Sequence, residues 1–121
     1  MSTLKAIGMA ALFLAIFLSG YGLHRLGKPC HTLLFTLHKL VSLGAMAWLL
    51  VTAARAQRAA PLPALAVSLV IAATVFFVAT IITGGLVSLE KPAPTAVAWA
   101  HKLLPYLTAA SSAAAWVLLG R

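Results

Sequence analysis

The chain has 121 residues, of which 63% are hydrophobic and 8% are charged, and its formal net charge is +8 at pH 7. Water-soluble domains average about 25% charged residues, so this composition excludes an ordinary soluble domain and indicates a membrane protein. Its Lys and Arg residues stand at or near the ends of apolar stretches, where they anchor helices among lipid headgroups, and the charge therefore predicts no nucleic-acid partner.

Four apolar stretches are bounded by polar residues or prolines: Leu4–Leu26, Thr32–Ala54, Leu62–Leu89 and Ala96–Leu119. Each reaches the roughly 20 residues that a helix needs to cross about 30 Å of hydrocarbon. We expect one all-α membrane domain over residues 1–121, a four-helix transmembrane bundle. The alternative for the first stretch is a cleaved secretory signal peptide, with Lys5 as its basic flank.

An internal repeat fixes how these stretches are arranged. The triplet His38-Lys39-Leu40 recurs as His101-Lys102-Leu103, 63 positions later, and this offset gives nine identities between 22–40 and 85–103. Repeat 1 covers about 4–58 and repeat 2 about 62–121, which predicts two tandem helical hairpins related by a parallel pseudo-twofold axis along the membrane normal. Because 4–29 match 67–92, the repeat argues against removal of the first stretch.

In chain order, small residues spaced by three or four mark the first stretch, which allows close approach of another helix or a flat ligand. They are Gly8, Ala11, Ala15, Ser19 and Gly22. Gly27-Lys28-Pro29 predicts a helix stop and a turn into the second stretch. The single cysteine, Cys30, excludes an internal disulfide and a Cys-x-x-Cys-His site for covalent haem.

The second stretch carries His31 and His38 and leads into the most polar segment of the chain, Arg55–Pro61, which we expect to be a loop. The third stretch ends before Glu90, the only acidic residue. In the fourth, Pro105 lies four residues after His101, so it frees the carbonyl of that histidine and predicts a kink.

His38 and His101 are the candidate site, because a histidine inside a membrane span is costly and marks function by default. The pseudo-twofold repeat offers two imidazole nitrogens at equal depth on either side of a central slot. Such a pair suits the axial coordination of one six-coordinate haem iron between helices 2 and 4. If helix 2 starts near Thr32, His38 lies about 9 Å from that end and about 24 Å from the other.

Other repeated residues fit a porphyrin at this depth. Gly22 and Gly85 would make room for the edges of the ring. Lys39, Lys102 and Arg25, with Lys28 and Lys91, place cations where two propionates would emerge; the alternative for the lysines is that they only extend to the headgroups.

This pattern resembles the four-helix haem bundle of membrane b-type cytochromes, as in respiratory cytochrome b, in which helices 2 and 4 supply axial histidines and glycines on helices 1 and 3 make room for the ring. The resemblance spans almost the whole chain and rests on His38, His101, Gly22 and Gly85. It implies one haem b per chain and electron transfer with a quinol or a surface redox protein. Those bundles usually carry a second histidine about 14 residues on, where this chain has Thr52 and Ala115, so no haem pair is expected.

Other interpretations stay open at this stage. The protein is alternatively a membrane haem carrier or sensor, or a cofactor-free small transporter or assembly subunit in which the histidines make interhelical hydrogen bonds. His24 and His31 are candidates for a second metal site, or else solvated interfacial residues, since their repeat counterparts are Val87 and Pro94.

For its setting in the cell, we expect an integral protein of the inner or plasma membrane. The raw counts of cations at the two ends, four and five, do not decide the orientation. If propionates occupy several cations at the end where the haem is expected, the balance favours both termini in the cytoplasm and the haem near the outer face. The lipid-facing surface also leaves room for a homodimer. The chain is expected to be an electron-transfer protein or an oxidoreductase subunit rather than a stand-alone enzyme.

Overall fold

The computed structural model describes residues 3–28, 31–89 and 91–120, and all regular structure in these ranges is helical. The helices are α1 (Thr3–Leu26), α2 (Thr32–Ala59), α3 (Ala64–Val87) and α4 (Thr95–Leu119). Each is long and apolar enough to cross a membrane. The expected all-α class and the four span-length helices are confirmed, consistent with an integral membrane protein. Expectations that concern Pro29, Cys30, Glu90 and Arg121 lie outside the described residues.

The helix ends follow from local sequence. Gly27 has a φ of 72°, a left-handed conformation in which glycine carries no steric cost, and its N–H donates to the Leu23 carbonyl at 3.2 Å. The predicted stop of α1 is therefore confirmed. At the start of α2, His31 is the N-cap, and its Nδ1 accepts the Leu34 N–H at 3.2 Å.

The boundary between α2 and α3 differs from the expectation. The segment Arg55–Pro61 is not all loop, because α2 continues to Ala59. Alanine, arginine and glutamine are strong helix formers, so the helix runs on until Pro61 ends it. The Gln57 Oε1 accepts the Leu62 N–H at 2.9 Å, and Pro63 caps α3, which begins at Ala64 instead of Leu62.

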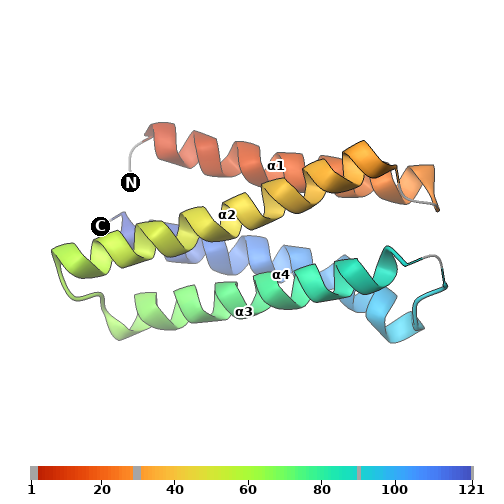
Figure 1. Cartoon of the computed structure of the whole chain (residues 1–121). Helices are drawn as coiled ribbons and strands as arrows, with labels where there is room; N and C mark the ends of the chain where they lie inside the picture. The colour runs from red at the N-terminus through yellow and green to blue at the C-terminus, as the bar shows by residue number, and fades with distance from the viewer. Residues whose placement is uncertain (1–2, 29–30, 90, 121) are drawn as a thin grey trace.

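The four helices form two antiparallel pairs, in which α1 packs on α2 and α3 packs on α4, while α2 also contacts α3 and α4. Figure 1 shows the two pairs lying one above the other, with the start of α1 and the end of α4 at the same end of the bundle. We call this the terminal end. The opposite end, where α2 and α4 begin, is the loop end. Pro105 lies within α4, which changes direction along its course in Figure 1.

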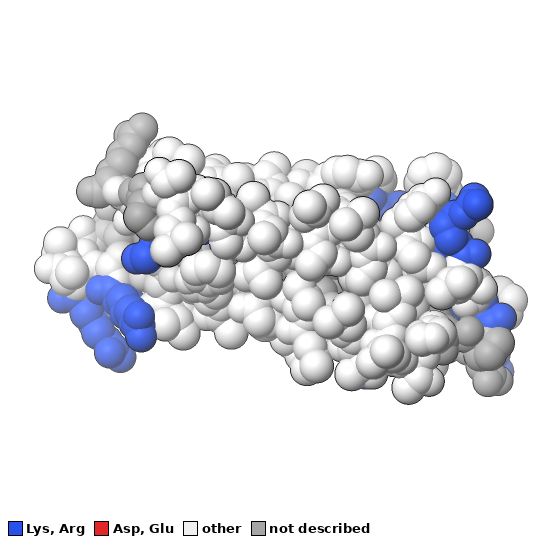
Figure 2. All heavy atoms as spheres, turned by 90° about the horizontal axis from the view of Figure 1, so that it is seen from above, with Lys and Arg blue, Asp and Glu red and all other residues white. Residues whose placement is uncertain are grey.

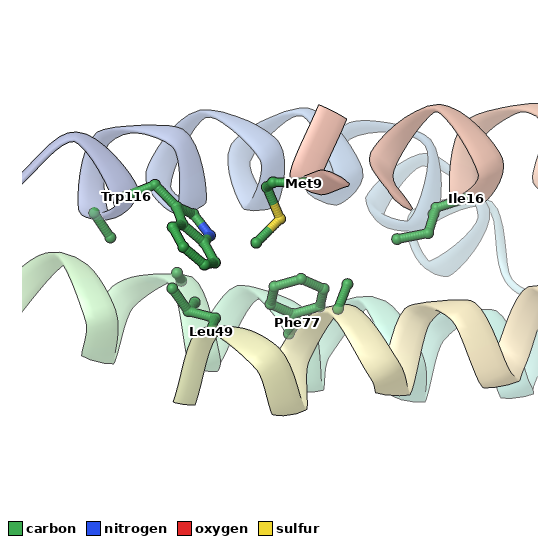
Figure 3. Packing of buried hydrophobic residues seen from close by; sticks show 8 residues of the cluster. Met9, Ile16, Leu49, Phe77 and Trp116 are labelled. Carbon is green, nitrogen blue, oxygen red and sulfur yellow. The ribbon is translucent and has the colours of Figure 1, made fainter. Parts of the chain in front are cut away.

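The hydrophobic core fills the middle of the bundle and its terminal half. Met9, Leu49, Phe77 and Trp116 are buried, and their side chains meet between the helices in Figure 3. The rings of Trp48 and Trp116 pack edge to face, 5.6 Å apart at 84°. Three alanines in this core, Ala45, Ala73 and Ala115, are fully buried, and their small side chains let the helices approach closely.

The loop half of the bundle is packed differently. Among the described residues of 20–44 and 78–107, none is buried, although these segments come from all four helices. The chain therefore builds a closed apolar core in one half only.

Positive charge gathers at the two ends of the bundle. On the face drawn in Figure 2, the blue atoms of Lys and Arg lie toward the left and right extremes and leave an uncharged band between them. An apolar band between two basic ends is the pattern expected of a bundle whose ends reach the lipid headgroups.

The core predicts where the bundle is sensitive to truncation. Phe77 is 3% exposed and Val75, two residues away on the same helix, is 59% exposed. We expect Phe77→Ala to lower the free energy of unfolding in mixed micelles by about 3–5 kcal/mol, because a buried cavity is left, and Val75→Ala to change it by less than about 0.5 kcal/mol. Equal effects of the two variants would contradict the assigned core.

Candidate functional site

The two candidate ligands occupy equivalent depths. His38 is the sixth residue after Thr32, where α2 begins, and His101 is the sixth after Thr95, where α4 begins. At 1.5 Å per residue both lie about 9 Å from the loop end. Both side chains are half-buried.

His38 contacts a hydroxyl group on the neighbouring helix. Its Nδ1 lies 2.8 Å from the Oγ of Ser19 on α1. The single hydroxyl hydrogen of Ser19 is directed to backbone, because Oγ lies 2.7 Å from the Ala15 carbonyl oxygen and 3.1 Å from that of Ile16. The hydroxyl oxygen therefore accepts, and the Nδ1 of His38 is the donor.

His101 repeats this arrangement on the other pair of helices. Its Nδ1 lies 3.1 Å from the Oγ1 of Thr83 on α3. The Thr83 hydroxyl is directed to the carbonyls of Ala79 at 2.9 Å and Thr80 at 3.0 Å, so it too accepts from the imidazole. In both pairs the serine or threonine fixes the ring orientation and the tautomer.

The chemical consequence concerns the second ring nitrogen. A neutral imidazole carries one N–H, so a proton held on Nδ1 leaves a lone pair on Nε2. A hydrogen bond from the other ring nitrogen is the usual support of a metal-bound histidine, since it orients the ring and raises its basicity. In both histidines Nε2 is thus the nitrogen that keeps a lone pair.

Glycines let the rings lie against the neighbouring backbone. A Cβ added to Gly20 would lie 3.1 Å from the Cε1 of His38, and one added to Gly84 would lie 2.8 Å from the Cε1 of His101. A Cβ at Gly84 would thus force the His101 ring to shift, and one at Gly20 would require the His38 ring to move by a few tenths of an ångström. Each ring therefore packs closely against one dipeptide, Ser19-Gly20 or Thr83-Gly84.

The glycines singled out from the sequence lie elsewhere. A Cβ on Gly22 would lie 3.1 Å from Leu34 Cδ2, and one on Gly85 would meet no atom within 4 Å. Neither glycine contacts an imidazole in this way, and their role in making room for a porphyrin stays a prediction.

The backbone carbonyls of the two histidines have different partners. The Ser42 hydroxyl donates to the carbonyl of His38 at 2.7 Å. The equivalent position on α4 is Pro105, which has no N–H to give to the carbonyl of His101. The His38 carbonyl therefore gains a side-chain donor from the residue four positions on, and the His101 carbonyl loses its backbone donor there.

The predicted cations surround the loop end. The Lys39 ammonium lies 4.6 Å from the centre of the Phe35 ring, and that of Lys102 lies 5.0 Å from the Trp99 ring. Both amines reach back over the preceding turn, toward the loop end, in cation–π contacts. Arg25 is exposed in the last turn of α1. These positions agree with lysines extending to the headgroups, while pairing with propionates stays a prediction.

His24 and His31 do not join the two interior histidines. Both are exposed, and the Nδ1 of His31 is occupied by its capping hydrogen bond. Within 3–28, 31–89 and 91–120, no three His, Cys, Asp or Glu side chains come together as a metal cluster.

Thr52 and Ala115 stand where the haem bundles that the sequence resembles carry a second histidine. Ala115 is fully buried in the core, next to the Trp116 ring that packs on Trp48, and Thr52 lines a surface hollow at the terminal end.

Sequence reasoning missed Ser19, Gly20, Thr83 and Gly84 as parts of the site. A signal was present, since a small hydroxyl residue followed by glycine occurs on both helices. These dipeptides are 64 positions apart, whereas the histidines are 63 apart, because Ser19 lies 19 residues before His38 and Thr83 lies 18 before His101. A comparison at one fixed offset does not align them.

Comparison of the chain with protein families, with curated proteins and with solved structures gives no match. The function is therefore argued from the site itself.

The tautomer assignment predicts a measurable change. Thr83→Val keeps the shape of the side chain but removes the oxygen that accepts from His101. The change costs a hydrogen bond of about 1 kcal/mol and leaves the Nδ1 proton without this acceptor, so Nδ1–H is no longer the favoured tautomer. We expect the imidazole ¹⁵N shifts of His101, in labelled protein in nanodiscs, to change from the Nδ1–H pattern, with His38 unaffected. The control is Thr74→Val, whose hydroxyl bonds its own helix at Val70. A wild-type spectrum with Nε2–H at both histidines would refute the assignment.

Proposed function

We propose that the protein is an integral membrane b-type cytochrome that binds one haem through His38 and His101 and transfers electrons. The observation that carries the proposal is the matched pair of hydrogen bonds, from His38 Nδ1 to Ser19 and from His101 Nδ1 to Thr83, which leaves a lone pair on each Nε2. When bound, haem would supply a one-electron carrier whose two histidine ligands leave no open coordination position on the iron.

The packing supports a planar ligand between the two helix pairs. None of the described residues of 20–44 and 78–107 is buried, so the loop half lacks the apolar core that closes the terminal half. A haem has a large apolar face and two carboxylates. The apolar surface would replace the missing core, and Lys39, Lys102 and Arg25 would lie on the side where the carboxylates reach the headgroups.

The proposal includes the tandem repeat, in which the two hairpins are structural copies about a pseudo-twofold axis. Supporting it, the Lys28 ammonium donates to the backbone carbonyl of Lys91 at 3.1 Å. These two residues are repeat equivalents, and a residue can contact its own equivalent only near the symmetry axis. Such an axis would pass between the two histidines and give both the same depth.

The partner is proposed from the depth of the site. Histidines about 9 Å from the loop end are far from the terminal end, so one haem cannot carry electrons across the whole bilayer. We propose exchange with a quinol in the bilayer or with a redox protein at the loop end, with both termini in the cytoplasm.

The half-burial of both histidines favours a second candidate, a haem carrier or sensor. A site without a buried apolar shell allows haem to leave more readily than a closed one. Tight retention of haem favours the cytochrome, and ready transfer of haem to an acceptor such as apomyoglobin favours the carrier.

The proposal predicts the absorption spectrum of the detergent-purified protein, oxidised and reduced with dithionite. We expect a low-spin b-type spectrum in the wild type and its loss or conversion to high spin in His38→Ala and in His101→Ala, because each removes one axial ligand. His31→Ala, which removes an exposed histidine, is the matched control and should leave the spectrum unchanged. A colourless wild type that takes up no added haem would refute the function.

The glycine against the His101 ring gives a second, subtler prediction. Gly84→Ala places a Cβ against the His101 ring, whereas Gly44→Ala adds the same methyl group where nothing lies within 4 Å. We expect Gly84→Ala to weaken haem retention by about 10–100-fold, the usual effect of losing support for a metal-bound histidine, and Gly44→Ala to have little effect. Haem retention is measured as the rate of transfer to apomyoglobin. Equal retention in the two variants would mean that Gly84 does not support the ligand.

A further inference from the structure

A surface hollow at the terminal end is not used by the proposed haem site. It measures about 320 Å³, and its lining includes the cations Lys5 and Arg55, the Thr52 hydroxyl and the apolar side chains of Trp48 and Leu119. Three helices contribute to it, since Lys5 comes from α1, Leu119 from α4 and the others from α2. The hollow is thus built by the tertiary structure and not by a single helix end.

The electrostatics of the hollow favour an anion. Arg55 and Lys5 both line it, and the described residues include no Asp or Glu. A guanidinium presents a planar fork of N–H donors that matches two oxygens of a phosphate or carboxylate. No acidic side chain among the described residues therefore pairs with Arg55.

The position of the hollow selects the kind of anion. Arg55 lies in the last turns of α2 and Lys5 in the first turns of α1, at one of the two ends where Figure 2 shows blue atoms beyond the uncharged band. Cations beyond an apolar band are expected at the level of the lipid headgroups. The wall formed by Trp48, Val51 and Leu119 is apolar, so one side of the hollow suits a phosphate and the other an acyl chain.

A smaller hollow of about 40 Å³ adjoins the larger one. It shares Lys5, Thr52 and Leu119 with the larger hollow, and Trp116 forms part of its lining. The Nε1 of Trp116 is itself buried away from this space, without a hydrogen-bond partner in the described part of the chain.

We propose that this hollow is a binding site for the phosphate group of an anionic phospholipid, held by Arg55 and Lys5 with Thr52 as a further donor. The acyl chain follows the apolar wall into the bilayer. The site lies at the opposite end of the bundle from the histidines, and the proposal is independent of haem binding.

The test uses the full-length protein in detergent micelles and native mass spectrometry with added phosphatidylglycerol or phosphatidylcholine. We expect phosphatidylglycerol to be retained in preference. A cation near an anionic lipid contributes about 1 kcal/mol, so Arg55→Gln and Lys5→Gln should each weaken the apparent affinity about fivefold, and the double variant about 25-fold. The matched control is Arg58→Gln, which removes a cation from the same end of α2 but not from the lining of the hollow.

Several results would overturn the proposal. Equal losses in Arg58→Gln and Arg55→Gln would mean general attraction to a basic surface. Equal retention of phosphatidylglycerol and phosphatidylcholine by the wild type would mean that the hollow does not select an anionic lipid. This comparison needs no variant, so the test decides the proposal even if Arg55→Gln does not fold. Displacement of the lipid by millimolar inorganic phosphate would identify a site for free phosphate, and circular dichroism checks that each variant stays helical.

Discussion

The hydrogen bond between an imidazole and a hydroxyl on the neighbouring helix sets the geometry of this protein. Within the hydrocarbon region a serine or threonine has no water to bond, so its hydrogen goes to its own helix backbone and its oxygen remains an acceptor. The imidazole supplies the donor. Because the hydroxyls lie on α1 and α3 and the rings on α2 and α4, each bond joins the two helices of one hairpin and fixes their register. The same bond keeps the proton on Nδ1, so Nε2 is the ring nitrogen that has a free lone pair.

The two halves of the bundle differ in how their helices pack. In the terminal half, large side chains such as Phe77, Leu49 and Trp116 fill the space between the helices, and alanines allow the close approach. In the loop half the helices carry glycines, hydroxyls and histidines at the equivalent places, and these cannot form an apolar core. One half therefore provides the stability of the fold, and the other is free to carry polar groups that would otherwise be costly in a membrane.

Much of this could be predicted from the sequence, because membrane thickness imposes helix length and because Gly27, Pro61 and Pro63 mark helix ends strongly. The end of α2 was predicted too early, since arginines were read as loop residues although they are good helix formers where a helix leaves the bilayer. Of the site, the histidines stood out, whereas Ser19 and Thr83 did not. A hydroxyl residue in a membrane helix usually bonds only its own backbone, as Ser68 and Thr74 do, and only the packing of two helices shows which hydroxyl also faces a ring.

The two hairpins are tied unequally at the two ends of the bundle. At the terminal end they are joined by residues 60–63, a short segment stiffened by two prolines and by the contact of Gln57 with Leu62. At the loop end a hydrogen bond from Lys28 to Lys91 links them on the exposed surface. The chain connection and the buried core thus hold the two hairpins together in the terminal half. At the loop end the link is an exposed hydrogen bond, so separation of the two hairpins would begin there.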